Sequence, residues 1–320
     1  MTPLVMGLDG GGTKTILALA DSTGAVVLYE RAAGIGPLES GHWLPRFQAL
    51  MQSLAPHEPA IAFGSFGMPS YDEVPAVSQR QREAVDSVAS FPHCTLNDVH
   101  TAFEGAFAGR SGVLLLAGTG SMVWAGDAAG THLRVGGWGH GIGDEGSGFW
   151  IGHEAVAALS HCLDGRAIDA EFAEAIASHI GLPYERRAEA LMNWYYDRGE
   201  IRVKVAALAR AVDALSEAGN ATARMLLTRA ADHLAAHVRA AWQRLPSLPH
   251  GVWSGVGSVM HSGHVARRLE VQLQAPLTPP ALPPIGGALW RAATNAGWPI
   301  DEAWIGRLRN ALALYSVSQD

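Results

Sequence analysis

A set of residues that suits phosphate chemistry lies near the start of the chain: Asp9, Gly10, Gly11, Gly12, Thr13, Lys14 and Thr15. Apolar runs of strand length flank the three glycines, which therefore fall at a hairpin turn. A residue without a Cβ lets backbone N–H groups approach an anion closely. The threonines add hydroxyl donors, Lys14 adds a cation, and Asp9 adds a carboxylate that can hold a hydrated Mg²⁺. The segment predicts a phosphate clamp, and a plain glycine hairpin with a solvated Lys14 is the alternative interpretation.

The elements around this turn are predicted from hydrophobic periodicity and turn residues. Strands are expected at 4–9, 15–21, 25–31, 61–63 and 94–96, and helices from residue 41, at 75–89 and at 98–108. The first three strands form an antiparallel meander, because the segment at 21–24 has the composition of a tight turn. The first half of the chain is thus an α/β unit that opens with three strands.

The second half repeats this plan. Strands are expected at 113–117, 122–126, 133–136 and 252–255, with a glycine-threonine turn, Gly118-Thr119-Gly120-Ser121, after the first of them. Residues 145–246 read as almost wholly helical, 276–284 as a proline-rich connection, and 286–297 and 301–315 as closing helices. We expect two lobes, residues 1–109 with the C-terminal helix at about 301–320, and residues 110–300 with the helical insertion 145–246.

Composition excludes several function classes. The net charge is −7, with 30 acidic against 23 basic residues and no long basic run, which disfavours nucleic acid and anionic membranes as partners. No apolar stretch approaches the ~18 residues of a membrane-spanning helix, and no basic leader precedes the first strand, so a cytoplasmic protein is expected. Cys94 and Cys162 are far apart, and the 14 histidines show no zinc-ligand spacing.

Six strings taken together carry a resemblance to a known family. They are GLDGGGTKT at 7–15, LNDVHTAFEGA at 96–106, LAGTGS at 116–121, GGWGHGIGDEGSGFWIG at 136–152, SGVGSV at 254–259 and PPIGGALW at 283–290. The chain resembles the superfamily of sugar kinases, actin and heat-shock-chaperone ATPases, within the group of N-acetylglucosamine kinases and benzoyl-CoA reductase-type activator ATPases. This resemblance implies two actin-like, ribonuclease H-like lobes, each with a βββαβα core, and a nucleotide cleft between them.

The resemblance also implies how ATP and Mg²⁺ are bound. Asp9 would position hydrated Mg²⁺, and the phosphates would lie on the two glycine turns, with the adenosine on a third. The nucleotide-binding residues implied in this way are Gly11, Gly12, Thr13, Lys14, Gly118, Thr119, Gly120, Gly255, Gly257 and Ser258.

For the acceptor, the resemblance makes Asp98 the general base that takes the proton of a sugar 6-hydroxyl, a task that requires a carboxylate. Helix N-cap is the alternative role for Asp98, since Asp is common there. The implied sugar-binding residues are Asp98, Ser121, Gly137, Trp138, Gly139 and Asp144. Asp144 and Glu145 have an alternative role as acids at the start of a helix, where they would interact favourably with the helix dipole.

The resulting hypothesis is an ATP-dependent kinase of N-acetylglucosamine, with a homodimer common in the resembling family. Glucosamine is the nearest alternative substrate. The resemblance implies that the unusual loop after the third strand folds over the C2 position, where Glu39 would attract an ammonium group, and the alternative is that Glu39 points to solvent. The stretch GSFGMPSYDEVP at 64–75 also departs from the plainer glycine turn expected there. An activator ATPase would need closely spaced cysteines for an iron–sulfur cluster, and a glucokinase or repressor of the related type would carry a cysteine-rich zinc loop. The chain has neither.

Overall fold

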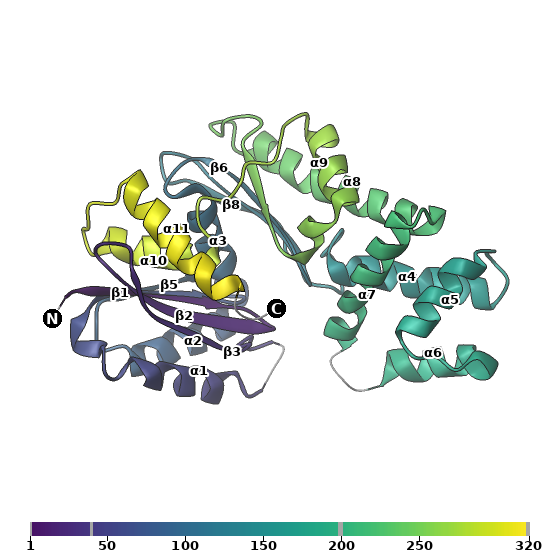
Figure 1. The fold of residues 1–320 in the computed structure, drawn as a ribbon, viewed down its shortest axis with the longest axis horizontal. Helices are drawn as coiled ribbons and strands as arrows, with labels where there is room; N and C mark the ends of the chain where they lie inside the picture. The colour runs from purple at the N-terminus through teal and green to yellow at the C-terminus, as the bar shows by residue number, and fades with distance from the viewer. Residues whose placement is uncertain (1, 39–40, 198–200, 318–320) are drawn as a thin grey trace. The chain divides into compact units, whose positions relative to one another are not determined.

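The computed structural model describes residues 2–38, 41–197 and 201–317. The chain forms two compact units, Met1–Arg110 with Pro279–Asp320, and Ser111–Thr278 (Figure 1). We call them unit 1 and unit 2.

Unit 1 is built on a five-stranded sheet in the order β3-β2-β1-β4-β5. Its strands are β1 (Leu4–Gly10), β2 (Lys14–Asp21), β3 (Val26–Ala33), β4 (Ile61–Met68) and β5 (His93–Asn97). The first three form the antiparallel meander, while β4 is parallel to β1 and β5 is parallel to β4. The carboxyl ends of β1, β4 and β5 therefore meet at one edge of the sheet.

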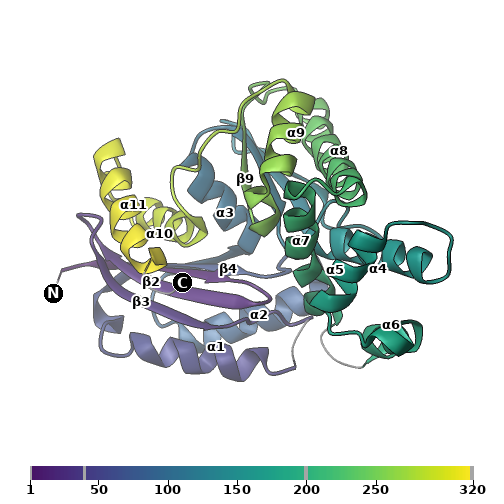
Figure 2. The same cartoon turned by 45° about the vertical axis from the view of Figure 1, so that its right-hand side comes forward.

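Helices cover both faces of this sheet (Figures 1 and 2). They are α1 (Trp43–Met51), α2 (Pro75–Val88), α3 (Asp98–Phe107), α10 (Pro284–Asn295) and α11 (Glu302–Val317). Side chains alternate along β1 and β2, because successive residues of a strand point to opposite faces. Leu8 and Leu17 join the core under α1, and Val5 and Ile16 join the core under α10 and α11.

The boundary between the units differs from the prediction. Residues 279–300, expected in the second lobe, lie in unit 1. The proline-rich connection is tied to α3, since Ala281 N–H donates to Ala106 O at 3.0 Å and Leu282 N–H donates to Gly105 O at 2.8 Å. Gly287 of α10 has no room for a Cβ against the backbone of α3. Helix α10 therefore belongs to unit 1 and not to unit 2.

Unit 2 has a four-stranded sheet in the order β8-β7-β6-β9, which matches β3-β2-β1-β4 of unit 1. Its strands are β6 (Gly112–Ala117), β7 (Ser121–Gly126), β8 (His132–Gly136) and β9 (Trp253–Val256), with β9 parallel to β6. The βββαβα order predicted for both lobes is confirmed. In unit 1 a further strand, β5, extends the sheet.

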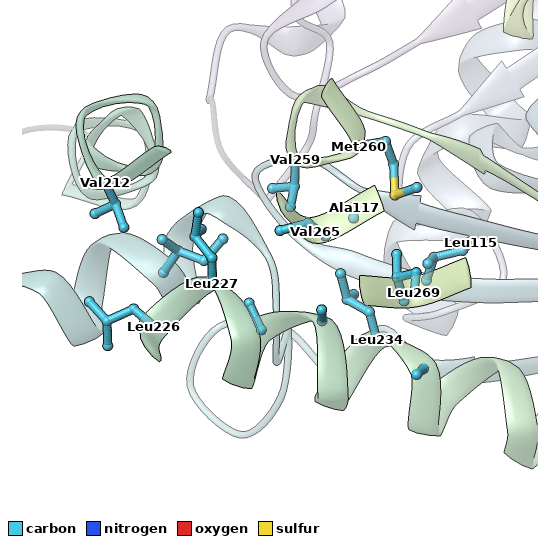
Figure 3. Close-up of a cluster of buried hydrophobic side chains, with 14 of the residues drawn as sticks. Leu115, Ala117, Val212, Leu226, Leu227, Leu234, Val259, Met260, Val265 and Leu269 are labelled. Carbon is cyan, nitrogen blue, oxygen red and sulfur yellow. The ribbon is translucent and has the colours of Figure 1, made fainter. Parts of the chain in front are cut away.

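The described part of unit 2 also contains the α-helices α4 (Gly148–Leu163), α5 (Ala170–His179), α6 (Arg187–Tyr196), α7 (Ile201–Glu217), α8 (Ala221–Arg244) and α9 (Gly263–Leu273). Leu115 of β6, Leu234 of α8 and Leu269 of α9 are fully buried in one cluster (Figure 3). Helices α8 and α9 pack side by side on this cluster. The sheet that bears the second glycine turn is therefore packed against a buried hydrophobic core.

Among the described residues, no helix is long and apolar enough to cross a membrane.

Candidate functional site

Backbone hydrogen bonds hold the glycine-rich turn after β1 in one shape. Gly11 N–H donates to Lys14 O at 2.9 Å, and Ile35 N–H donates to Gly11 O at 3.1 Å. Gly34 N–H donates to Thr13 O at 3.0 Å. The chain after β3 therefore fixes the turn from one side. A turn held in this way can present its other backbone groups without further ordering when a ligand binds.

The exposed part of this turn is its tip. Gly12, Thr13 and Lys14 are exposed to solvent. Thr15, by contrast, is fully buried in β2, which removes its hydroxyl from the set that could meet a ligand. The tip thus offers backbone N–H groups, one hydroxyl and one ammonium.

Asp9 and Asp98 are brought together by the register of the sheet. Asp9 is level with Gly67 of β4, and Gly67 is level with Leu96 of β5. Asp98 follows two residues later, as the first residue of α3. Both carboxylates therefore lie at the carboxyl edge of the sheet, where open α/β sheets bind ligands.

The two carboxyl groups hold their protons tightly. Burial raises the pKa of Asp9 from 3.8 to about 6, against the opposing charge of Lys14. Burial also raises the pKa of Asp98 well above its ordinary value, and the negative charges of Asp9 and Glu73 add to this effect. Strongly perturbed carboxylates of this kind gather at functional sites.

The N-cap role falls to Asn97. The Asn97 side-chain oxygen accepts a hydrogen bond from Val99 N–H at 2.9 Å, and its amide donates to Tyr71 O at 2.8 Å and to Glu73 at 3.2 Å. Asp98 Oδ1 also accepts from Val99 N–H at 2.9 Å. These contacts fix the first turn of α3 and hence the position of the Asp98 carboxyl.

Glu73 is a residue that sequence reasoning did not select. It lies in the loop between β4 and α2, where Ser70 and Asp72 adopt left-handed φ values of 59° and 60°. Two non-glycine residues in this conformation indicate a strained loop that its contacts hold in place. The unusual sequence of 64–75 was the available signal, but it gave no role for the acid.

The second glycine turn, Gly118–Ser121 in unit 2, is held by the start of α4. Gly148 N–H donates to Gly118 O at 2.7 Å, and Phe149 N–H donates to Thr119 O at 3.2 Å. Ser121 Oγ donates to Glu145 O at 2.9 Å. The carbonyl groups of Gly118 and Thr119 therefore face α4. This arrangement fixes the turn that joins β6 and β7.

The third glycine turn lies beside the second one. Strand β9 is parallel to β6, with Gly255 level with Leu115. Gly257 has a left-handed φ of 103°, and Ser258 begins a short 3-10 turn. A Cβ on Gly118 would lie 4.0 Å from the Gly257 Cα. Gly118 and Gly257, which have no side chains, therefore lie next to each other at one edge of this sheet.

The Gly137-Trp138-Gly139 strip follows β8. Gly137 and Gly139 have left-handed φ values of 70° and 81°. Gly137 N–H donates to Ser121 O at 3.1 Å, which joins the strip to the second glycine turn. The Trp138 side chain is 65% exposed, and the Arg134 guanidinium lies 5.3 Å from its ring centroid. An exposed indole next to a glycine strip suits the apolar face of a sugar ring.

Asp144 departs from the role that the resemblance implies. Its side chain is buried, and Oδ2 accepts a hydrogen bond from Arg202 at 3.1 Å. Oδ1 lies 3.4 Å from the Ser121 N–H that points to it. The carboxylate therefore serves the protein's own groups. Glu39, the other acid considered for the substrate, lies outside the described residues.

The structure thus groups the selected residues by unit. Unit 1 brings together Asp9, Asp98 and the first turn, and unit 2 brings together the second turn, the third turn and the tryptophan strip. Arg202 in unit 2, like Glu73 in unit 1, was missed. It lies 58 positions from Asp144, and no local pattern connects the two.

Comparison with known proteins identifies relatives of this chain. A curated N-acetylmuramic acid/N-acetylglucosamine kinase of Clostridium acetobutylicum is 28% identical over 250 residues, 74% of this chain and 78% of that protein. An N-acetyl-D-glucosamine kinase of Dictyostelium discoideum is 23% identical over 253 residues, 72% of this chain and 76% of that protein.

A solved structure of a candidate N-acetylglucosamine kinase from Chromobacterium violaceum has a TM-score of 0.73 at 24% identity and covers 90% of this chain and 98% of that one. This likeness confirms the two-lobe, actin-like fold class. The family model described as the BadF/BadG/BcrA/BcrD ATPase family matches residues 6–290, which include every site residue named above. The chain belongs to the BadF/BadG/BcrA/BcrD ATPase family.

Proposed function

We propose that this chain is an ATP-dependent amino-sugar kinase that phosphorylates N-acetyl-D-glucosamine at its 6-hydroxyl. The observation that carries the proposal is the Asp98 carboxyl, fixed at the start of α3 next to Asp9 and high in proton affinity. The two curated relatives named for N-acetylglucosamine support the substrate class. Glucosamine remains the alternative substrate, and a homodimer remains a prediction.

The residues present fit a magnesium ion that arrives with the nucleotide. Mg²⁺ is commonly bound by one or two carboxylates together with phosphate oxygens and water. No group of three potential metal ligands exists among the described residues, so a site made by the protein alone is not expected there. Asp9 is half-buried, and its raised pKa shows that the charge of Lys14 does not offset the loss of hydration. A cation near Asp9 would supply that charge.

In this proposal, Asp9 holds Mg²⁺ through water, and Mg²⁺ neutralises part of the phosphate charge when bound. The exposed tip at Gly12, Thr13 and Lys14 binds phosphate oxygens with backbone N–H groups, a hydroxyl and an ammonium. Gly11 is half-buried, and its N–H, which donates to Lys14 O, holds the shape of the turn. Gly118, Thr119 and Gly120 form the second phosphate-binding turn. Gly255, Gly257 and Ser258, at the end of β9 beside this turn, are proposed to contact the adenosine.

Asp98 acts as the general base. Its carboxylate accepts the proton of the 6-hydroxyl while the 6-oxygen attacks the γ-phosphorus. The raised proton affinity suits this task, since a carboxylate with the ordinary value of 3.8 is a weak base at neutral pH. Asn97 cannot replace it, because its amide takes no proton and is already held by three partners.

The sugar ring is proposed to contact Ser121, Gly137, Trp138 and Gly139. The exposed Trp138 indole covers an apolar face of the ring, and Gly139, where a Cβ would meet no atom within 4 Å, leaves open space beside it. Asp144 is left out of this set, because its buried carboxylate is already engaged by Arg202 and lies close to the backbone of Ser121.

The test is a panel of hexoses incubated with purified protein, ATP and Mg²⁺, with ADP release as the readout. N-acetylglucosamine should give the highest kcat/KM, and the product should be the 6-phosphate by NMR. Equal ADP release with and without sugar would contradict the kinase proposal. A preference for glucosamine would correct the substrate and keep the reaction.

A further inference from the structure

A glutamate that the proposed mechanism does not use lies beside the tryptophan strip. Its main chain is tied to the second glycine turn, because Ser121 Oγ donates a hydrogen bond to Glu145 O at 2.9 Å. The residues on both sides of it, Asp144 and Gly146, have left-handed φ values of 59° and 80°. A Cβ on Gly146 would lie 2.6 Å from Ala230 O, so the chain presses against α8 at this point. The fold therefore fixes the position of Glu145.

The Glu145 carboxylate faces a histidine of α8. Its Oε2 lies 3.8 Å from His237 Nε2, a distance that is too long for a hydrogen bond but allows electrostatic attraction to a protonated ring. His237 Nδ1 lies 2.8 Å from His233 O. Because a carbonyl oxygen only accepts hydrogen bonds, Nδ1 carries a hydrogen and donates it there. The ring is thus held in one orientation, with Nε2 toward Glu145.

The same imidazole rests on the backbone at the start of the strip. A Cβ on Gly136 would lie 2.5 Å from His237 Nε2 and Cδ2, so only glycine leaves room for the ring. Gly136 ends β8, and the next residue, Gly137, donates its N–H to Ser121 O at 3.1 Å. Glu145 therefore adjoins the strip by two routes, one through His237 and one through Ser121.

The carboxylate has capacity for a ligand. The Glu145 side chain is 40% exposed, whereas that of His237 is 12% exposed. Among the described residues, no protein group donates a hydrogen bond to the Glu145 carboxylate oxygens. An ionised carboxylate accepts at about four lone-pair positions, and the hydroxyl groups of a sugar are suitable donors. Glu145 is therefore an exposed acceptor at the edge of the proposed sugar site.

We propose that Glu145 is a substrate-contacting residue that accepts a hydrogen bond from a ring hydroxyl of the sugar, with His237 as its positioning residue. The inference rests on the proposed function, which places the sugar on Ser121 and the tryptophan strip. All of these residues lie in unit 2. The contact forms when the sugar binds and persists during transfer, so it strengthens sugar binding and takes no part in the proton transfer.

The first test compares Glu145→Ala and Glu145→Gln with Glu154→Gln. Glu154 is a matched control, because its carboxylate also pairs with a side chain of α8, that of Arg229, at 2.8 Å. Glu145→Ala should raise the KM for N-acetylglucosamine about 10- to 100-fold and change kcat less than about threefold, since the lost contact is equal in the ground and transition states. Glu145→Gln should raise this KM less, because its amide oxygen still accepts but carries no charge.

The second test measures sugar binding without turnover. Calorimetry without ATP compares N-acetylglucosamine with its 1-deoxy, 3-deoxy and 4-deoxy analogues. In the wild type and in Glu154→Gln, the analogue that lacks the hydroxyl bound by Glu145 should bind about tenfold or more weakly than the parent sugar. In Glu145→Ala this difference should shrink to less than about twofold. Glu145→Gln, in which the difference should narrow, carries the comparison if the alanine variant does not fold.

The third test concerns the positioning role of His237. His237→Ala should raise the KM for the sugar about three- to tenfold, and His237→Gln, whose amide can again face the carboxylate, should give a smaller rise. In the Glu145→Ala background, His237→Ala should cause no further rise, because no carboxylate is left to position. A rise of equal size in both backgrounds would show that His237 acts on the fold alone.

Two results would overturn the role of Glu145. One is a KM rise below about threefold in both Glu145 variants, and the other is a set of deoxy-analogue differences that persists unchanged in Glu145→Ala. If the wild type phosphorylates N-acetylglucosamine, either result removes Glu145 from the site and leaves the kinase proposal intact. A wild type that neither binds nor phosphorylates any hexose would contradict both proposals.

Discussion

Gly118 and Gly257 lie side by side at the ends of the parallel strands β6 and β9, with 4.0 Å between a Cβ built on Gly118 and the Gly257 Cα. Their surroundings differ. A Cβ on Gly118 meets no other heavy atom within 4 Å, whereas a Cβ on Gly257 would collide with the backbone of Ala117. Gly257 also has a φ of 103°, which side chains rarely allow. Gly257 is thus required by the fold, whereas Gly118 is not.

This difference predicts opposite effects of two alanine substitutions. Gly118→Ala should leave the free energy of unfolding nearly unchanged and weaken ADP binding by about tenfold or more, or roughly 1.4 kcal/mol, because the methyl group occupies the proposed phosphate surface. Gly257→Ala should lower the free energy of unfolding by about 2 kcal/mol or more through strain and collision. Urea unfolding and calorimetry with ADP measure the two quantities.

Each variant serves as the control of the other. Unchanged ADP affinity in Gly118→Ala would show that the turn does not bind the nucleotide. Full stability of Gly257→Ala would contradict the backbone geometry at the end of β9.

Asp98→Asn tests the proposed base. The amide keeps the shape of the side chain and cannot accept the proton, so kcat should fall about 10²- to 10⁴-fold. ADP affinity should stay close to the wild-type value, and the melting temperature should not fall, because the raised pKa of Asp98 means that the fold disfavours its charged form. The measurement is steady-state turnover with N-acetylglucosamine, and a loss below about tenfold would remove Asp98 from the mechanism.

The sequence predicts the parts of this molecule that depend on local patterns. Apolar runs of strand length and glycine turns predict the strand that carries Asp9 and the strand that precedes Gly118, since both signals are local. The boundary at residue 300 was wrong because a proline-rich stretch gives no sign of the backbone bonds that Ala281 and Leu282 make to α3. Arg202 and Glu73 escaped prediction because tertiary contacts alone bring them to the site.

A buried ion pair should hold α10 on α3. Glu104 of α3 is 3% exposed and pairs with Arg291 of α10 and with His100. Arg291→Met leaves this carboxylate without its cation, which should cost on the order of 3 kcal/mol of unfolding free energy at pH 7. The exposed Arg80→Met on α2 is the control. Urea unfolding of both variants gives the comparison.

The effect should depend on pH in a defined direction. Burial raises the pKa of Glu104, but hydrogen bonds from His100 and the charge of Arg291 outweigh it and bring the pKa below the ordinary 4.5. The pair therefore contributes its stability above pH 4.5, and this contribution is lost as the pH falls through the folded-state pKa. A constant difference between Arg291→Met and wild type from pH 7 down to pH 3 would contradict this assignment.

The contribution of Asp9 to stability should change with pH in the opposite direction, because its pKa in the folded chain, about 6, lies above the ordinary 3.8. The folded state binds this proton more tightly than the unfolded chain, so the contribution is fully present below pH 3.8 and is lost as the pH rises through 6. Without nucleotide or Mg²⁺, Asp9→Asn should therefore be more stable than wild type at pH 8, by about 1 to 3 kcal/mol, and less so at pH 5. Urea unfolding at the two pH values measures this, with the exposed Glu217→Gln as control. Parallel pH profiles of the free energy of unfolding for Asp9→Asn and wild type would show that the charged carboxylate is not destabilising in the free protein. That result would also contradict the proposal that Asp9 needs a nearby cation.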